Sequence, residues 1–385
     1  MRIAFVSSYL SPHQLPFCLA MSAYEAVEFT FIATIPVSEE RLKLGYQNLD
    51  RIYPFVICAY DGDWQSKLAE DIIEKADIVI AGKAPWQLFV KRIKQKKIVI
   101  RYSERQLKKG LEPIKYMARY IRWKKTAPPN SPCYLLCASA YAAYDYSLFG
   151  LYKNKAFKWG YFPEKKEYDS IESVIQNKKK TILWAGRLLD WKRPDFVIEL
   201  AKRLKNKGKN IEINIIGTGP LENALRSAID KYDLMKMVHL LGAMEPDEVR
   251  QHMEKSSVFV FTSNRQEGWG AVLNEAMNSG CAVVASDVIG SAPFLIDDNV
   301  NGMLFKHNDL DDFIGKVETV LADEDLCFDL GKRAYETIIN HWNAQNAADR
   351  LIELCSALLA HQDPNVLFKE GICSPAEIIK DNWKN

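Results

Sequence analysis

The chain lacks the long apolar runs and the charge bias that mark membrane-spanning and nucleic-acid-binding proteins. No stretch of its 385 residues approaches the ~20 consecutive apolar residues that a transmembrane helix needs. The net charge is only +2, from 51 lysines and arginines against 49 acidic residues, so overall charge gives no case for nucleic acid as a partner. Internal repeats and low-complexity segments are also missing. What remains is a globular composition, 48% apolar, and a length that suits two domains with separate cores.

Paired metal-binding cysteines and a secretion signal are missing as well. The eight cysteines are scattered, apart from Cys133 and Cys137, and no histidine or second cysteine pair completes a zinc pattern. We therefore expect no metal, and buried thiols in a reducing cytosol. The first residues enter a strand-length apolar run without the longer apolar region and cleavage site of a signal peptide. The expected location is cytoplasmic.

Short apolar runs alternate with amphipathic stretches along nearly the whole chain. Near-continuous Val, Ile and Phe are typical of strands covered on both faces, and strand–helix alternation predicts parallel sheets with right-handed crossovers. A first series of expected strands covers 3–7, 29–34, 78–81, 98–102 and 134–138, and a second covers 181–185, 211–217, 238–241, 258–262 and 282–286. The fold class is therefore α/β, with two Rossmann-like domains.

A polar stretch over 164–180, with few apolar anchors, is interpreted as the linker between these domains. The predicted N-terminal domain is 1–163 and the predicted C-terminal domain is 181–350. A helical tail over 351–385 is expected to cross back to the first domain. Because parallel sheets bind ligands at the carboxyl ends of their strands, we expect the two domains to face each other across a cleft.

The most informative segment is a strand–loop–helix unit within 259–287. Its loop carries Glu267 and Gly268, and a helix is expected from Gly270 to Asn278. Free N–H groups at that helix start, on Gly270, Ala271 and Val272, suit an anionic diphosphate. Glu267 and Glu275 flank this start, and carboxylates at such positions suit sugar hydroxyls better than phosphates.

Two further strand-to-helix loops carry a similar signal. Gly186 and Arg187 follow the strand that ends near Ala185, and Lys192 lies five positions after Arg187. Two fixed cations there would neutralise a departing diphosphate. Gly217 opens a Gly-Thr-Gly-Pro turn, which on its own is equally well a structural turn.

These motifs resemble, in combination and in chain order, those of retaining glycosyltransferases of family 4, which have the GT-B fold. Glu267 and Glu275 are similar to the family's E-x7-E pair, Gly186 to Lys192 to its G-R-x-x-x-x-K donor-phosphate signature, and the turn at Gly217 to its G-x-G-P loop. The resemblance covers about 181–323. It implies that Glu267 orients the transferred sugar, that Glu275 binds the ribose, and that backbone around Gly242 and Ala243 holds the base.

The first domain departs from the family, because no glycine-rich loop follows its first strand. His13 is its only histidine and lies just past that strand, so His13 and Gln14 are candidates for contacts to sugar or acceptor. A histidine capping a helix start is the alternative. Glu104 and Arg105 end another strand and are candidates for acceptor or phosphate binding, with a surface ion pair as the alternative.

Between Lys91 and Lys125 the chain holds fourteen lysines and arginines and only two glutamates. Apolar and aromatic residues, Trp123 among them, are interleaved with these charges. A basic helix of this kind suits an anionic membrane surface, where lipid-linked acceptors reside, so a peripheral position on the cytoplasmic membrane face is expected. A solvated basic face is the alternative.

The sequence thus predicts transfer, with retention, of a sugar from a nucleoside diphosphate sugar, UDP-sugar first, to a glycan or lipid-linked acceptor in cell-surface polysaccharide assembly. No cofactor or metal is expected, because the cations Arg187 and Lys192 can replace a divalent ion at the departing diphosphate. Three alternatives stay open: a non-catalytic sugar-nucleotide-binding subunit, a sugar-nucleotide epimerase and a phosphorylase.

Overall fold

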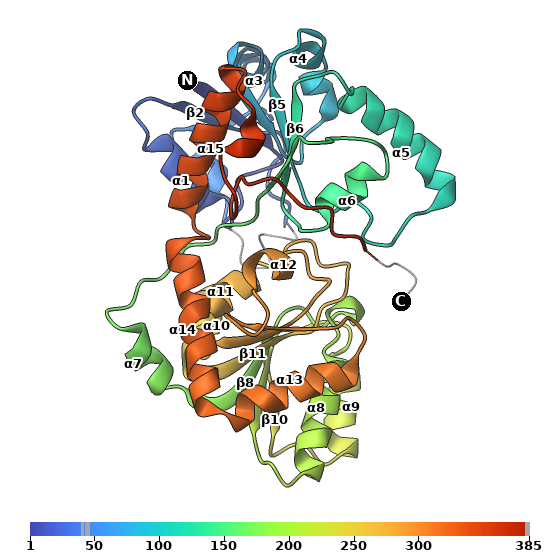
Figure 1. Ribbon diagram of the computed structural model, residues 1–385, viewed down its shortest axis with the longest axis vertical. Helices are drawn as coiled ribbons and strands as arrows, with labels where there is room; N and C mark the ends of the chain where they lie inside the picture. Colours follow the sequence, from blue (N-terminus) through green and yellow to red (C-terminus); the bar gives the residue numbers. More distant parts are fainter. Residues whose placement is uncertain (40–41, 43–46, 382–385) are drawn as a thin grey trace. The chain divides into compact units, whose positions relative to one another are not determined.

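The computed structural model describes residues 1–39, 42 and 47–381. The chain divides into two compact units (Figure 1). Unit 1 combines Met1–Glu164 with the segment that begins at Trp342, and unit 2 is the continuous stretch Lys165–His341. Each unit has its own parallel sheet and its own apolar core.

Unit 1 is built on a seven-stranded parallel sheet with the order β3-β2-β1-β4-β5-β6-β7. Chain order reverses between β1 and β4, which is the switch point of a doubly wound sheet. Its strands are β1 (Arg2–Ser7), β2 (Glu28–Ala33), β3 (Val56–Cys58), β4 (Ile78–Ala81), β5 (Val99–Ser103), β6 (Cys133–Cys137) and β7 (Ala156–Lys158).

The sheet of unit 2 has six parallel strands in the order β10-β9-β8-β11-β12-β13. Its switch point lies between β8 and β11, where Val258 pairs with Ile182 and Phe259 with Leu183. Its strands are β8 (Lys179–Ala185), β9 (Glu212–Ile216), β10 (Val238–Gly242), β11 (Ser256–Phe261), β12 (Ala282–Ser286) and β13 (Met303–Phe305).

Helices form the crossovers between these strands. In unit 1 the helices and 3-10 turns are α1 (Leu15–Ser22), η1 (Leu49–Arg51), α3 (Asp63–Lys75), η2 (Trp86–Phe89), α4 (Val90–Lys94), α5 (Pro113–Thr126), α6 (Ala142–Ser147), α15 (Ala344–Leu359) and η4 (Pro364–Val366). In unit 2 they are α7 (Ile171–Gln176), η3 (Asp190–Lys192), α8 (Asp195–Asn206), α9 (Glu222–Lys231), α10 (Pro246–Lys255), α11 (Val272–Asn278), α12 (Ala292–Leu295), α13 (Leu310–Ala322) and α14 (Glu324–Asn340).

The predicted α/β class with two Rossmann-like parallel sheets is confirmed. The apolar runs that predicted strands are fully buried in β4 and β12, one strand from each sheet, whereas β10 is only half-buried after Val238. The strands that the sequence did not predict, β3, β7 and β13, have three residues each. Such short strands give too little pattern for a periodicity argument.

The stretch interpreted as a linker, 164–180, differs from that interpretation. It contains α7, whose Ile171 and Ile175 pack against Tyr335 of α14 in unit 2. Its last residues already belong to β8. The expected boundary at residue 350 also differs, because the chain enters unit 1 again at Trp342.

The C-terminal segment completes unit 1 in two ways. Helix α15 packs beside α1 (Figure 1). Further on, the N–H of Cys373 donates to the carbonyl of Lys158 at 2.8 Å and the N–H of Lys158 donates to Ser374 at 2.8 Å. Residues 373–376 therefore cover the free edge of β7 in an antiparallel arrangement.

Candidate functional site

The switch point of unit 2 brings two loops together, one after β8 and one after β11. The Thr262 hydroxyl accepts a hydrogen bond from Trp184 Nε1 at 2.9 Å and donates one to the carbonyl of Lys192 at 2.8 Å. The N–H of Asn264 donates to the carbonyl of Trp191, also at 2.8 Å. These bonds hold the predicted arginine–lysine loop against the predicted glutamate loop.

Lys192 and Glu267, 75 positions apart, form an ion pair between Nζ and Oε2. The Ser263 hydroxyl donates to the same Oε2 at 2.9 Å. The two charged side chains are only 13% and 10% exposed, and Lys192 Nζ also lies 5.4 Å from the centre of the Phe261 ring. The carboxylate is thus held by two donors in a low-dielectric setting, with its remaining lone pairs available to a ligand.

Arg187 differs from Lys192, with which the sequence grouped it. Its side chain is exposed, and the part of the chain that the structure describes offers it no hydrogen bond or ion pair. Lys192 is largely neutralised by Glu267 in this structure. Arg187 is therefore the cation of this loop that is available to bind an anion.

Two glycines are needed because the loops approach so closely. A Cβ on Gly217, whose φ is +131°, would lie 1.9 Å from the carbonyl oxygen of Gly186. A Cβ on Gly270, at φ +88°, would lie 2.6 Å from the Phe261 ring. The N–H of Gly217 donates to the carbonyl of Gly242 at 2.6 Å, so the backbone of three predicted donor-binding glycines, from three different loops, lies close together. Ala243 follows Gly242 directly in the chain.

The helix predicted to start at Gly270 starts later. Helix α11 begins at Val272, with Ala271 as its N-cap residue, and has seven residues. Gly270 instead supplies the left-handed turn before it, and the N–H of Leu273 donates to its carbonyl at 3.0 Å. Gly268 is buried within the loop.

Glu275 lies one turn into α11, with a half-buried side chain. Desolvation raises the pKa of its carboxyl group from 4.5 to about 7, and the charge of Arg250 opposes this only in part. Arg250 reaches across from α10 and donates to the backbone carbonyl of Glu275 at 2.9 Å and to the side chain of Asn278. The sequence analysis missed Arg250, because nothing in α10 sets this arginine apart from the solvated charges around it.

In unit 1, three of the predicted residues lie along the carboxyl edge of the sheet. The ring of His13 stacks on Tyr161 with centroids 5.8 Å apart and planes 10° apart. Tyr161 donates its hydroxyl to Glu104 Oε1 at 2.5 Å, and Lys108 donates to Oε2 at 2.7 Å. Gln14 accepts from the Ser11 hydroxyl at 3.1 Å and precedes α1 without capping it through its side chain. Tyr161, which joins His13 to Glu104, was missed.

For Arg105, the alternative interpretation as a surface ion pair is wrong. Its side chain is fully buried, with Nη2 2.5 Å from Asp381 and 3.5 Å from Asp145, and its guanidinium lies 4.9 Å from the centre of the Tyr141 ring. Asp145 is in turn held by the N–H groups of Gln106 and Leu107. Three charged groups from distant parts of the chain meet here, and sequence spacing could not indicate that.

The basic stretch from Lys91 to Lys125 is less exposed than its composition indicates. Arg92 is buried and donates to several carbonyls, among them those of Ile73 and Ala76, both at 2.7 Å. Trp123, expected beside the charges, packs inward against Phe149. The outer face of α5 instead presents Met117, 59% exposed, and Ile121, 50% exposed.

Over the described ranges the structure holds no group of three or more His, Cys, Asp and Glu side chains arranged for a metal ion. Nor does any helix in those ranges have the length and apolar character needed to cross a membrane. All eight cysteines are free thiols.

The family comparison matches unit 2. Residues 165–337 match the model described as Glycosyl transferases group 1. A poly(ribitol-phosphate) alpha-N-acetylglucosaminyltransferase of Staphylococcus aureus is 27% identical over 176 residues, which are 46% of this chain and 35% of the relative. The amylovoran biosynthesis glycosyltransferase AmsK of Erwinia amylovora is 33% identical over 157 residues, 40% of this chain and 38% of the relative. The chain spans less than half the length of these relatives.

Solved structures extend the likeness to both units. Anabaena HepE, solved in complex with UDP, has a TM-score of 0.66 and 14% identity, covering 93% of this chain and all of that one. A glycosyltransferase from Rickettsia africae has a TM-score of 0.63 and 16% identity, covering 93% of this chain and 98% of that one. At this identity the likeness shows the fold, which is that of two-domain glycosyltransferases.

Proposed function

We propose, from the premise that residues 165–337 form a Glycosyl transferases group 1 domain, that this protein is a retaining, metal-independent glycosyltransferase. It moves a sugar from a nucleoside diphosphate sugar to a glycan or lipid-linked acceptor in cell-surface polysaccharide assembly. The observation that carries the proposal is the buried Lys192–Glu267 pair at the switch point of unit 2, with the exposed Arg187 on the same loop as the lysine.

Each charged group has a distinct task in this proposal. Glu267, held by Lys192 and Ser263, accepts hydrogen bonds from hydroxyls of the transferred sugar. Arg187 has no ion-pair partner among the described residues that a ligand would first have to displace. Together with Lys192 it neutralises the leaving diphosphate. Glu275 binds the ribose, and the backbone at Gly217, Gly242 and Ala243 lies beside the base.

The relatives guide the choice of substrates to test. HepE was solved with UDP, which makes UDP-sugars the first donors to try. The names of the two curated relatives refer to glycan polymers, poly(ribitol-phosphate) and amylovoran, which favours a polysaccharide acceptor. On the acceptor side we assign His13, Gln14 and Glu104, and we propose no role for nucleic acid as a partner.

The first experiment measures nucleoside diphosphate release from a panel of UDP-, GDP- and ADP-sugars, with and without membrane lipid extract. Wild type is expected to release diphosphate from one donor, faster with extract. Glu267→Gln and Arg187→Gln should each lose roughly a hundredfold in kcat, because each removes a group that acts where charge develops. Glu199→Gln, which breaks a surface ion pair on α8, is the matched control and should keep its activity.

Other outcomes separate the alternatives. A thermal shift that shows binding of a nucleoside diphosphate sugar, without any cleavage of that sugar, would indicate a non-catalytic subunit. Conversion of the donor into another sugar nucleotide without an acceptor would indicate an epimerase. An absorbance band of pyridoxal phosphate in the purified protein would indicate a phosphorylase. Inverted anomeric configuration of the product, read by NMR, would overturn retention.

A further inference from the structure

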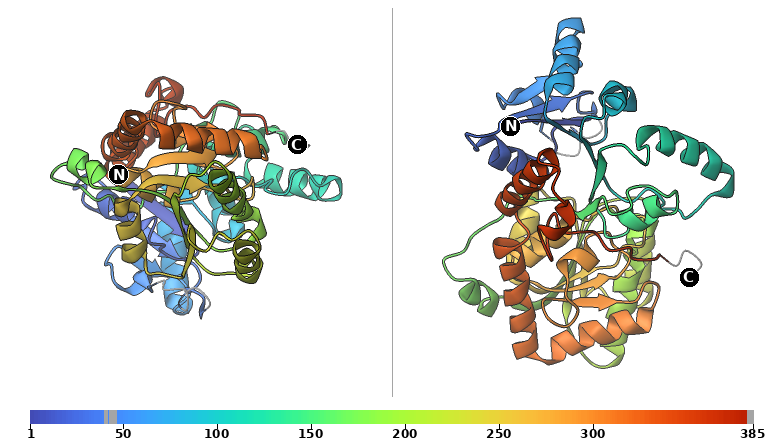
Figure 2. Two further views of the ribbon diagram at one scale, coloured as in Figure 1. Left: turned by 90° about the horizontal axis from the view of Figure 1, so that it is seen from below. Right: turned by 45° about the horizontal axis from the view of Figure 1, so that its top comes forward.

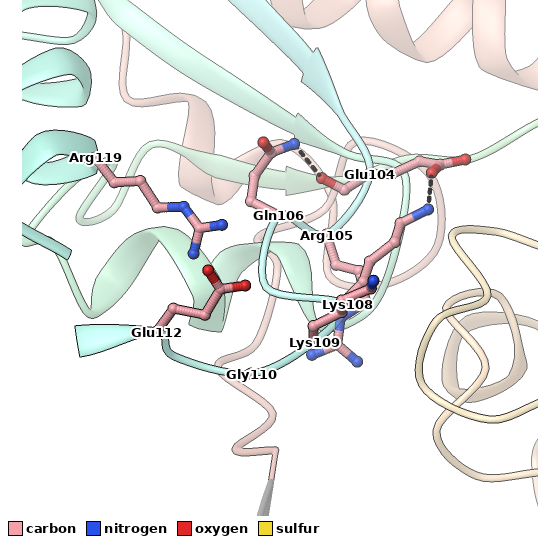
Figure 3. A pocket seen from close by; sticks show the side chains of 8 residues that line it. All are labelled: Glu104, Arg105, Gln106, Lys108, Lys109, Gly110, Glu112 and Arg119. Carbon is pink, nitrogen blue, oxygen red and sulfur yellow. Dashed lines mark hydrogen bonds and ion pairs between the residues drawn. The ribbon is translucent and has the colours of Figure 1, made fainter. Parts of the chain in front are cut away.

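A pocket of about 390 Å³ lies within unit 1, beside the carboxyl end of β5 (Figure 3). The residues that line it belong to unit 1, whereas the glutamate–lysine pair belongs to unit 2. Its side chains come from the loop after β5 and from α5. Those that matter here are Glu104, Arg105, Lys108, Lys109, Glu112 and Arg119.

Positive charge dominates the lining, with four cations against two carboxylates. Lys108 is already paired with Glu104 at 2.7 Å. Lys109 is exposed, and Arg119 points into the pocket from the opposite side in Figure 3. Within the described ranges, neither Lys109 nor Arg119 has an ion-pair partner. These two side chains give the pocket its surplus charge.

Buried hydrogen-bond donors without acceptors indicate a ligand that carries hydrogen-bond acceptors. Nη1 of Arg119 and both Nε and Nη1 of Arg105 are buried and find no hydrogen-bond partner among the described residues. Unsatisfied charged donors of this kind are costly, because burial removes their water without supplying an acceptor. An arginine fork matches the planar pair of oxygens that a carboxylate or phosphate presents.

Asp381 is the residue of this chain that would compete with an incoming anion for Arg105. It reaches Arg105 Nη2 at 2.5 Å from a position 276 residues further along the chain. Asp145 also contacts Arg105, at 3.5 Å, but its carboxylate is held by the N–H groups of Gln106 and Leu107 at 2.7 and 2.8 Å. Asp381 is therefore the carboxylate that an incoming anion would displace.

We infer that this pocket binds a phosphate or carboxylate group carried by the acceptor, so that the acceptor is an anionic glycan. The inference rests on the proposed function. Glu104, at the rim, connects through Tyr161 to His13, so the pocket is continuous with the edge of the sheet where we assign acceptor contacts. A bound anion satisfies the free N–H groups and offsets the charges of Lys109 and Arg119, which a neutral sugar would not.

The test measures binding of inorganic phosphate and of glycerol 3-phosphate to the full chain by isothermal titration calorimetry. All variants carry Arg187→Gln, so that phosphate bound at unit 2 contributes little. The double variant Lys109→Gln/Arg119→Gln should bind roughly tenfold more weakly than the background, and Asp381→Asn several-fold more tightly. Lys94→Gln removes a lysine outside the pocket on α4 and should bind as the background does. Equal affinity of the double variant and Lys94→Gln would overturn the inference.

A kinetic arm separates this inference from the proposed function. With Arg187 intact, Lys109→Gln/Arg119→Gln should raise KM for the acceptor and leave acceptor-free donor hydrolysis unchanged. Absence of all donor cleavage would overturn the proposed function while the phosphate titration still decides the pocket. Vesicles of phosphatidylglycerol distinguish the source of the anion: tighter binding than glycerol 3-phosphate, lost in the double variant, assigns a lipid-linked anion, and no gain assigns a soluble one.

Discussion

Among the ionisable groups of the predicted donor site, the Glu275 carboxyl group has the most strongly shifted pKa. Its pKa rises to about 7 because α11 and its surroundings desolvate it, so the folded state keeps the proton to higher pH than the unfolded chain does. Any stability that depends on this proton is present below pH 4.5 and is lost as pH rises to about 7. Above that range the folded protein carries a partly desolvated charge.

Glu275→Gln removes this titration and keeps the shape of the side chain. We expect the variant to unfold at a higher temperature than wild type at pH 8, and the advantage to vanish at pH 4.5. Thermal unfolding followed by circular dichroism at both pH values measures the difference. Glu199→Gln makes the same chemical change on the exposed face of α8 and controls for it. An advantage of equal size at pH 4.5 and pH 8 would count against a raised pKa.

Single residues also show which parts of the site the sequence could predict and which it could not. The loops around Glu267 and Lys192 could be predicted because each follows a buried strand and because the residues within each loop have a recognisable spacing along the chain. The contact between the two side chains could not, because it depends on β8 and β11 being neighbours. Arg105 shows the same limit, since its partners lie 40 and 276 positions away.

Among the elements of unit 1, α5 presents large apolar side chains to solvent, Met117 at 59% and Ile121 at 50% exposure. In both views of Figure 2 it stands out from the rest of that unit. Met117 and Ile121 are four residues apart, so they lie on one stripe, and the exposed Arg122 and Lys125 follow them. An apolar stripe beside cations suits an anionic membrane surface, where we propose that α5 binds.

Met117→Glu/Ile121→Glu places negative charge on this stripe. Flotation with phosphatidylglycerol vesicles should show at least tenfold weaker partitioning than wild type, because apolar contact is lost and the lipid charge repels the new carboxylates. Val366→Glu changes a residue of unit 1 that is 77% exposed and should bind as wild type does. If both variants float like wild type, α5 does not mediate membrane contact.

At the scale of the whole molecule, the two units differ in continuity. Unit 2 is one stretch of chain, whereas unit 1 needs α15 and the segment over 373–376. Helix α15 buries Leu351, Leu354 and Leu358 within unit 1. Without these parts, unit 1 would expose an apolar face beside α1 and the free edge of β7.

Two fragments test this difference. Residues 165–341 are expected to unfold in one cooperative thermal transition, because their sheet and core are complete. Residues 1–164 are expected to aggregate or to remain without a transition, and co-expression of residues 342–385 should restore solubility. Size-exclusion chromatography and calorimetry measure both outcomes. A stable, monomeric 1–164 fragment would show that α15 is dispensable.

The discontinuity of unit 1 has a consequence during synthesis on the ribosome. Domains generally fold as units while the chain emerges from its N-terminal end. Here unit 1 cannot complete its fold until α15 and residues 373–376 have been made, and these follow unit 2 along the chain. The second unit can reach its native state earlier, although its codons are read later. A chaperone that shields nascent chains would therefore have to hold the N-terminal half until α15 has emerged from the ribosome.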